Sequence, residues 1–254
     1  MNQNVFSKCM IIAFCLSSSI FANDIIVSLE GTTGAGKTTL LKILENNLPE
    51  VQIVYEPVEA MQDLGGCGNL LETYYKDMPR WSYLFQTYVF PIQAKAIEKA
   101  VLNSEKNIFV LDRSIYAGFY VFGKMLKESE YLNPMEWYSY CTVFDFMEQN
   151  FKHKINGFIY LQTSPETCYT RIAKRNRKEE QGAALDYYTD EFKYHEDWLL
   201  EKKDIYHERI KNDIPVLTLD GNIDFIKDEK NKQEIIRKIK CFINSIQLTN
   251  KNNK

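Results

Sequence analysis

Residues 24–48 read DIIVSLEGTTGAGKTTLLKILENNL, and they contain the first strand, the first turn and the first helix that we expect. The segment DIIVSLE (24–30) is apolar and β-branched, which predicts a strand. A glycine-rich turn follows it at once, and the apolar residues of TLLKILENNL recur at helical spacing. Within this frame, GTTGAGKT at 31–38 fits the phosphate-binding pattern GxxxxGKS/T completely.

This loop supplies the groups that hold a nucleoside triphosphate. Its glycines let backbone N–H groups turn inward around phosphate oxygens, and the start of the following helix adds partial positive charge. Lys37 adds a point charge for the outer phosphates, and Thr38 offers its hydroxyl to Mg²⁺. The dinucleotide fingerprint GxGxxG is not met, which disfavours a redox enzyme. The donor-binding residues predicted here are Gly31, Thr32, Thr33, Gly34, Ala35, Gly36, Lys37, Thr38 and Thr39.

Four more segments after the loop are predicted as strands, and they alternate with helical segments. This alternation is typical of an α/β domain with a parallel sheet covered by helices on both faces. Pro91 is expected to kink its helix. The predicted strands are 51–56, 108–112, 157–163 and 214–221. The predicted helices after the first are 67–76, 80–102, 114–127, 133–150, 165–178, 186–210 and 231–246.

We predict one domain over residues 24–246, followed by a polar tail at 247–254. Residues 1–23 resemble a secretory signal peptide or a disordered leader, so export stays open; they are too short and too serine-rich for a stable membrane span. The net charge of −3 shows no basic excess of the kind that marks a binder of nucleic acid polymers. The six cysteines lack metal-ligand spacing and are interpreted as buried thiols of a reducing compartment.

Two predicted strand ends carry charged residues. Asp112 is placed to hold Mg²⁺, and Arg113 is placed to neutralise charge on the phosphoryl group during transfer. Glu56 ends the second predicted strand and faces the same edge. A carboxylate beside a phosphate-transfer site suits an acceptor that must lose a proton, which indicates an alcohol. A monophosphate acceptor favours arginine there, but Tyr55 precedes Glu56.

Six motifs together resemble the deoxynucleoside kinases related to mitochondrial thymidine kinase and deoxycytidine kinase. The resemblance runs from about residue 25 to 220. It implies a P-loop kinase fold with a five-stranded parallel sheet and an arginine-rich lid, ATP as the donor, and a homodimer. The motifs are GTTGAGKTT, YEPVE, RWSYLFQTYV (80–89), DRSIYAGFYVF (112–122), SPETCYTRIAKRNRKEEQ (164–181) and YHEDWLL (194–200).

By this resemblance RIAKRNRKEEQ (171–181) is the lid. Arg171, Arg175 and Arg177 close over the donor phosphates, for which guanidinium forks are well suited. Glu180 reaches the 3′-hydroxyl of the sugar and shares it with Tyr75. His195, Glu196 and Trp198 match a motif that we interpret as helix packing.

The resemblance also assigns the base-binding residues. Gln86 matches the glutamine that reads the base edge, and its amide serves thymine or cytosine because it both donates and accepts. Val89 belongs to the same set. Gln93 and Gly118 replace an arginine and an aspartate of deoxycytidine-preferring members, which favours a pyrimidine pocket leaning to thymidine. The aromatic residues that wall the base or belong to the core are Trp81, Phe85, Phe119 and Phe122.

We therefore predict ATP-dependent phosphorylation of the 5′-hydroxyl of a deoxynucleoside. Glu56, Arg113 and Lys37 are the predicted catalytic residues, and Thr38 and Asp112 are the predicted metal ligands. Two alternatives stay open: a thymidylate kinase, and an exported nucleotide-binding module without catalysis. The ATP requirement predicts a cytoplasmic enzyme.

Overall fold

The computed structural model describes residues 24–180, 183–205 and 207–252, so the predicted leader lies outside the described residues. Its five strands form one parallel sheet, as predicted, and their order is β2-β3-β1-β4-β5. The strands are β1 (Ile25–Glu30), β2 (Val51–Val54), β3 (Ile108–Asp112), β4 (Gly157–Gln162) and β5 (Val216–Asp220). Among the described residues, no helix is both long enough and apolar enough to cross a membrane.

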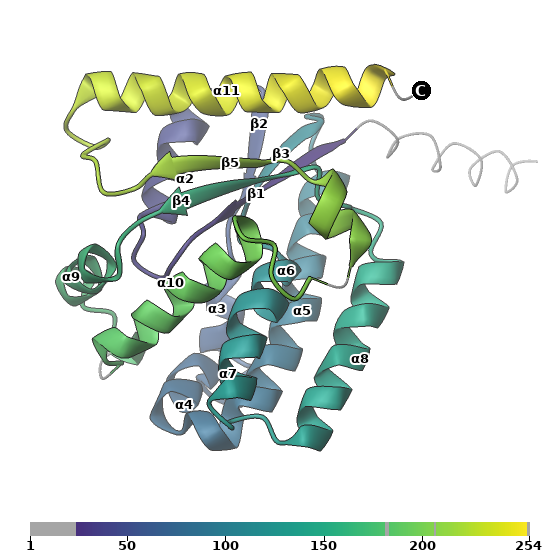
Figure 1. Cartoon of the computed structure of the whole chain (residues 1–254), viewed down its shortest axis with the longest axis vertical. Coiled ribbons are helices and arrows are strands. Elements are labelled where there is room, and N and C mark those ends of the chain that lie inside the picture. Colours follow the sequence, from purple (N-terminus) through teal and green to yellow (C-terminus); the bar gives the residue numbers. More distant parts are fainter. Residues whose placement is uncertain (1–23, 181–182, 206, 253–254) are drawn as a thin grey trace, which may run out of the picture.

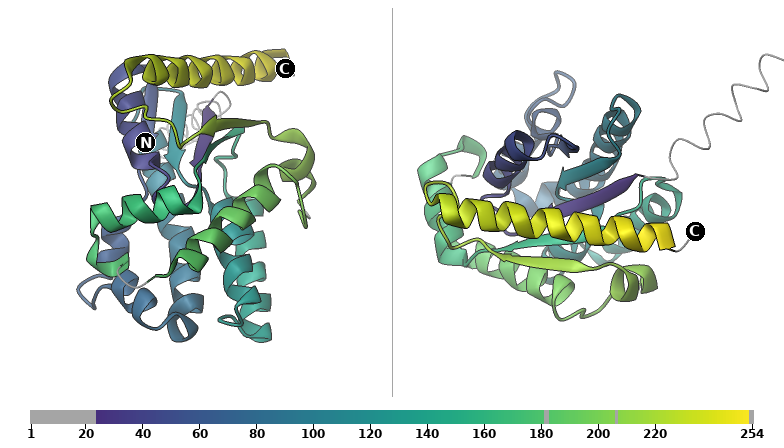
Figure 2. Two further views of the ribbon diagram at one scale, coloured as in Figure 1. Left: turned by 60° about the vertical axis from the view of Figure 1, so that its left-hand side comes forward. Right: turned by 90° about the horizontal axis from the view of Figure 1, so that it is seen from above.

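Helices cover both faces of the sheet (Figures 1 and 2). One face packs against α2 (Lys37–Asn47) and α11 (Glu229–Asn252), which share a hydrophobic cluster with alternate residues of β1, β3 and β4. The opposite face packs against the larger helices α5 (Met78–Leu102), α8 (Pro134–Asn150) and α10 (Leu185–Leu199). Strands buried on both faces explain why the sequence shows continuous apolar runs there.

Shorter helical segments connect these larger elements. Between α5 and α8 lies a π-helical segment of six residues, GFYVFG, of which all but Phe122 are buried. The short segments are α3 (Val58–Gln62), α4 (Leu70–Lys76), α6 (Ile115–Ala117), η1 (Gly118–Gly123), α7 (Lys124–Glu128), α9 (Pro165–Arg175), η2 (Lys178–Glu180) and η3 (Arg209–Asp213).

Some predicted boundaries differ from the observed ones. The second strand ends at Val54, so Glu56 lies in the turn after it. The helix predicted over 186–210 ends at Leu199 because Lys202 and Asp204 adopt left-handed backbone angles, which a helix cannot continue through. The helix α5 stays helical on both sides of Pro91, and α11 continues six residues past the predicted boundary at 246.

The cysteine prediction was partly wrong. Cys168 is buried, but Cys67 and Cys241 are exposed, because each lies in a polar surface segment rather than on an apolar face. All four described cysteines are free thiols.

Candidate active site

The central strands bring the predicted site residues to one edge of the sheet. Asp112, the last residue of β3, lies in register with Leu29 of β1, and the backbone N–H of Arg113 donates to the Leu29 carbonyl at 3.1 Å. The phosphate-binding loop leaves β1 one residue later. The hydroxyl of Thr38 at the start of α2 donates to Asp112 Oδ2 at 3.1 Å. Residues 74 positions apart thus meet where parallel strands end, which is the usual ligand-binding edge of such sheets.

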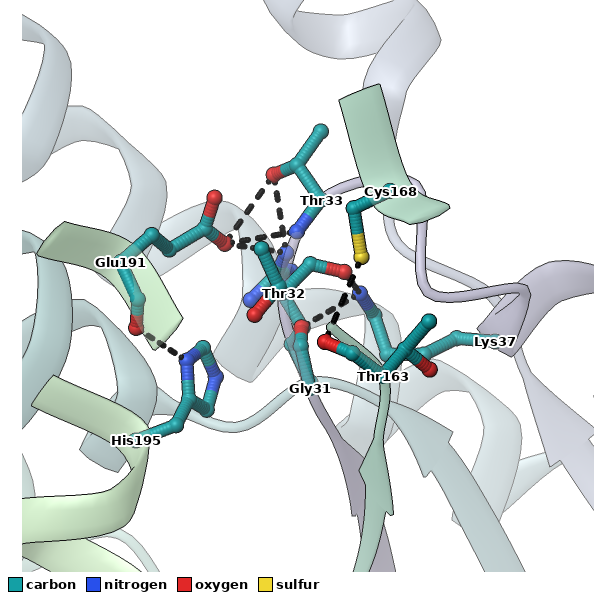
Figure 3. Close-up of polar contacts among 9 residues, drawn as sticks. Gly31, Thr32, Thr33, Lys37, Thr163, Cys168, Glu191 and His195 are labelled. Carbon is teal, nitrogen blue, oxygen red and sulfur yellow. Dashed lines mark hydrogen bonds and ion pairs between the residues drawn. The ribbon is translucent and has the colours of Figure 1, made fainter. Parts of the chain in front are cut away.

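The loop has the backbone conformation that its glycines permit. Gly34 and Gly36 have φ angles of 83° and 105°, in the left-handed region. Lys37 is buried, and its Nζ donates to the carbonyls of Gly31 at 2.7 Å and Thr32 at 3.2 Å (Figure 3). Burial, and then the nearby Arg113 charge, lower the pKa of Lys37 to about 8. The ammonium group is therefore held close to its titration point until an anion is bound.

This lowered pKa predicts that binding of the expected nucleotide donor depends on pH. In the free protein Lys37 is charged below about pH 8 and neutral above it. Because phosphate binding needs the charged form of Lys37, we expect the Kd for ATP to be about tenfold higher at pH 9 than at pH 7. Titration calorimetry without deoxynucleoside measures this. A Lys37→Met variant should bind ATP weakly at both pH 7 and pH 9. If its Kd changed with pH as much as that of the wild type, Lys37 would not be the group that causes the pH dependence.

Two cavities meet at the loop. The first has a volume of about 750 Å³ and extends from the loop to the segment 222–227, so we call it the donor cavity. The second has a volume of about 200 Å³ and lies against β2, α4 and α5, so we call it the acceptor cavity. Their shared wall consists of Gly34, Lys37, Thr38, Arg175 and Arg177. A chemical group transferred from one cavity to the other therefore moves along the phosphate-binding residues and two arginines.

The acceptor cavity gathers nearly all residues that were predicted to bind substrate. It is also lined by Phe85 and Phe122, whereas Phe119 is fully buried in the core and Trp81 packs beside α4. The side chain of Glu180 lies outside the described residues. The predicted substrate residues that line the cavity are Glu56, Tyr75, Gln86, Val89, Gln93, Arg113 and Gly118.

Glu56 lies in this cavity with the features of a proton acceptor. Its carboxylate is half-buried and makes no hydrogen bond to any residue within the described ranges. Burial raises its pKa; the Arg113 charge opposes that shift, and the negative charge of Asp112 adds to it. A carboxylate that has a raised pKa and no protein hydrogen-bond partner in the described ranges is suited to accept a proton from a bound hydroxyl.

Arg113 is held in an unusual conformation. Its φ of 69° lies in the left-handed region, which is costly for a side chain with a Cβ. Its guanidinium lies over the Phe122 ring at 4.9 Å, and Nη2 contacts a carboxylate oxygen of Glu191 at 3.0 Å. Burial alone would lower the pKa of Arg113, but the negative charges of Glu191, Glu56 and the other nearby carboxylates raise it by more. The pKa is therefore above its ordinary value, and the guanidinium stays charged.

The residues predicted to hold Mg²⁺ fit a hard cation. Asp112 Oδ1 is buried and has no hydrogen-bond partner in the described part of the chain, and the Thr38 hydroxyl lies beside the other oxygen. Within the described ranges there is no cluster of three or more His, Cys, Asp or Glu side chains able to hold a metal. One carboxylate and one hydroxyl suffice for Mg²⁺, because it keeps waters and takes further oxygens from substrate phosphates.

The predicted lid arginines occupy two different environments. Arg175 and Arg177 line both cavities. Arg171 lines the donor cavity, but its Nη1 donates to the Ala35 carbonyl at 2.7 Å and its Nη2 to the Gly221 carbonyl at 2.9 Å. Arg171 thus joins the phosphate-binding loop to the loop after β5, and its contact with donor phosphates stays a prediction.

The lid also docks on the helix that carries Tyr75. Glu179 Oε1 accepts hydrogen bonds from Gln62 Nε2 at 2.7 Å and from Asn69 Nδ2 at 3.1 Å. Asn69 is at the same time the N-cap of α4, where its Oδ1 accepts from the Glu72 N–H. One carboxylate of the predicted lid is therefore hydrogen-bonded to the end of α3 and to the start of α4.

Three parts of the site were missed in the sequence. The segment 222–227 lines the donor cavity, and Tyr187 lines the acceptor cavity. Glu191 contacts both Arg113 and the phosphate-binding loop. The first of these follows the strand β5 directly, so the strand-end rule that located Asp112 could have located it too. His195, Glu196 and Trp198 pack α10 onto the sheet, as interpreted from sequence.

Comparison with known proteins agrees with this geometry. A family model described as deoxynucleoside kinase matches residues 27–244. The mitochondrial deoxyguanosine kinase of Xenopus laevis is 34% identical over 236 residues, covering 85% of this chain and 89% of the relative. Deoxycytidine kinase 2 of Gallus gallus is 35% identical (86% and 90% covered), and the deoxycytidine kinase of Homo sapiens is 34% identical (87% and 91% covered). With its phosphate-binding loop, its two joined cavities and these relatives, the chain belongs to the deoxynucleoside kinase family.

Proposed function

We propose that this kinase transfers the γ-phosphoryl group of ATP to the 5′-hydroxyl of a deoxynucleoside. The supporting observation is the position of Glu56 in a cavity that meets the donor cavity at the phosphate-binding loop. An uncharged alcohol bound between this carboxylate and the loop has two neighbours that the reaction needs. The carboxylate on one side accepts its proton, and the phosphoryl donor lies on the other side.

The residues around this point have separate roles in the proposal. Glu56 accepts the proton of the 5′-hydroxyl as the oxygen bonds to phosphorus. Lys37 and Arg113 stabilise the charge on the transferring group, and Arg175 and Arg177 close over it from the lid. Thr38 and Asp112 would hold Mg²⁺, which when bound neutralises phosphate charge. Exclusion of water by the lid protects the transfer from hydrolysis.

For the base we propose a pyrimidine, with thymidine preferred. Gln86 and Gln93 are both buried and uncharged, and Gly118 presents no side chain to the cavity. This leaves room for the thymine methyl group, and Gln86 can pair with the thymine edge. The relatives are named as deoxycytidine and deoxyguanosine kinases, so the preference among bases rests on the pocket of this chain alone.

A substrate panel tests the proposal. Purified protein with ATP and Mg²⁺ is offered the four deoxynucleosides and thymidine monophosphate, and ADP release is followed by a coupled assay. We expect turnover of deoxynucleosides, fastest with thymidine, and none of the monophosphate. Phosphorylation of the monophosphate alone would instead indicate a thymidylate kinase, and no turnover of any of them a binding module; the family comparisons favour neither.

We also propose that the chain forms a homodimer through α8. Met135, Tyr138 and Phe146 expose 81%, 77% and 64% of their surface along this helix, and large apolar side chains grouped in this way mark an interaction surface. Light scattering should give twice the mass of one chain. A Tyr138→Glu variant should halve that mass without changing the fold, and a monomeric wild-type protein would contradict the proposal.

The ATP requirement supports a cytoplasmic enzyme, since ATP is abundant there. The segment that resembles a signal peptide lies outside the described residues. Fractionation of cells that produce the full chain, followed by intact-mass measurement, determines where the enzyme resides and whether the segment is removed.

A further inference from the structure

Glu191 is a charged residue buried where neither cavity reaches it. It lies on α10, its residue is 0% exposed, and it lines neither the donor nor the acceptor cavity. Burial of a carboxylate is unfavourable unless hydrogen bonds and an opposite charge compensate it. An uncompensated carboxylate at this place would destabilise the fold, so its partners indicate why it is there.

All of the hydrogen-bond donors found for the Glu191 carboxylate belong to the site. Its Oε1 accepts from the Thr33 backbone N–H at 2.9 Å and from the Thr33 hydroxyl at 3.1 Å (Figure 3). It also accepts from Arg113 Nη2 at 3.0 Å. Arg113 Nη2 in turn contacts the Thr33 hydroxyl at 3.2 Å. One oxygen therefore joins the phosphate-binding loop, the strand end of β3 and the helix α10.

This junction fixes the direction of the Arg113 guanidinium. Nη2 donates a hydrogen bond to Glu191, whereas Nη1 is buried and has no hydrogen-bond partner among the described residues. Arg113 lines the acceptor cavity, and of its two terminal nitrogens only Nη1 lacks an acceptor among the described residues. A planar guanidinium that is fixed at one nitrogen presents the other in a defined direction, without the entropy cost of ordering a free side chain.

We propose that Glu191 is a positioning residue for phosphoryl transfer. It holds Arg113 and Thr33 in one fixed relation, so that the guanidinium and the loop face the transferring group together. This inference rests on the proposed function and adds a residue to it. Glu191 does not contact the substrates; it acts through the two residues that do.

A residue that only supports the fold would behave differently, and α10 contains a matched control. Glu196 lies five residues later on the same helix and accepts partly buried hydrogen bonds, from Tyr160 at 2.5 Å and Gln162 at 3.0 Å. None of its partners lines either cavity. Loss of packing on α10 should therefore affect Glu191 and Glu196 variants alike, whereas loss of positioning should affect only Glu191 variants.

The test compares Glu191→Gln, Glu191→Met and Glu196→Gln in the full chain. Gln keeps an acceptor oxygen but loses the charge, and Met removes both. We expect kcat to fall about fivefold in Glu191→Gln and about 100-fold in Glu191→Met, with the KM for the deoxynucleoside within twofold, since small misplacement of a catalytic group is sufficient for such losses. Glu196→Gln should keep kcat within twofold while lowering Tm.

A second cycle identifies the route of the effect. In an Arg113→Lys background, Glu191→Gln should change kcat by less than twofold, because its effect runs through the guanidinium. An unchanged kcat in both Glu191 variants, equal losses in Glu191→Gln and Glu196→Gln, or additive losses in the cycle would each overturn the positioning role. Absence of turnover in the wild-type protein would instead refute the proposed function.

Discussion

Replacement of Glu56 by glutamine is expected to lower kcat by about 10²- to 10⁴-fold, the usual contribution of a general base. Glutamine has nearly the same shape but cannot accept the proton of the 5′-hydroxyl. The side chain of Glu56 makes no hydrogen bond to another described residue, so its replacement leaves no protein donor unsatisfied. The Kd for the deoxynucleoside should therefore stay within about threefold, by analogy with substitutions that remove only transition-state interactions.

The pH profile makes this prediction sharper. Burial raises the pKa of Glu56 above its ordinary 4.5. Below that raised pKa the side chain is protonated and cannot act as a base, so kcat should fall as the pH is lowered through it. This acid limb should be absent in Glu56→Gln.

Single-turnover kinetics with thymidine, together with calorimetric binding, measure both effects. Glu59→Gln is the matched control, because Glu59 lies one turn away on α3 and is exposed; it should behave as wild type. If Glu56→Gln kept its turnover number, another group would have to remove the proton.

Substitution of Gly34 by alanine is expected to abolish ATP binding and to destabilise the fold. Gly34 has a φ of 83°, and a Cβ there would lie 2.6 Å from the Cys168 carbonyl oxygen and 2.7 Å from Ile172 Cγ1. The left-handed conformation costs an alanine roughly 1–2 kcal/mol, and overpacking against a backbone atom costs about 1–3 kcal/mol more. The loop has to move away from α9 to relieve the contact, and its N–H groups then no longer converge on phosphate.

Gly66 provides the control for this substitution. Its φ of 80° is nearly the same, but a Cβ there meets nothing within 4 Å. Gly66→Ala should therefore show only the conformational cost of roughly 1–2 kcal/mol and retain activity. Denaturant unfolding and ATP titration compare the two variants. Equal stability losses and equal ATP affinities in both would show that the contact with α9 has no influence on the loop.

Much of the site could be predicted from the sequence because its residues follow local rules. The loop 31–38 has a fixed pattern, and Asp112 and Arg113 follow a short apolar run that is typical of a buried parallel strand. The parallel sheet then carries these residues to one edge. The acceptor-cavity residues came from the family motifs rather than from physical patterns, since Gln86 and Gln93 alone resemble ordinary helix residues.

Glu191 could not be predicted, because its partners lie far away in the chain. It contacts Thr33 across 158 positions and Arg113 across 78. In the sequence it is one of several acidic residues in an amphipathic helix, where a solvent-exposed position is the ordinary interpretation. Only the packing of α10 against the loop reveals that this particular acid is buried.

The helix α11 adds a consequence for biosynthesis. Its residues Ile235, Ile239 and Ile243 pack in the same cluster as Leu40 and Leu44 of α2, the helix that begins at the phosphate-binding loop. Every residue assigned to the site precedes this helix in the chain. A nascent polypeptide on the ribosome therefore carries a full set of active-site residues while the sheet face that α2 and α11 share is covered by α2 without α11. We expect enzymatic activity to appear only after α11 has left the exit tunnel, and messages with a stop codon before position 229 to yield inactive protein.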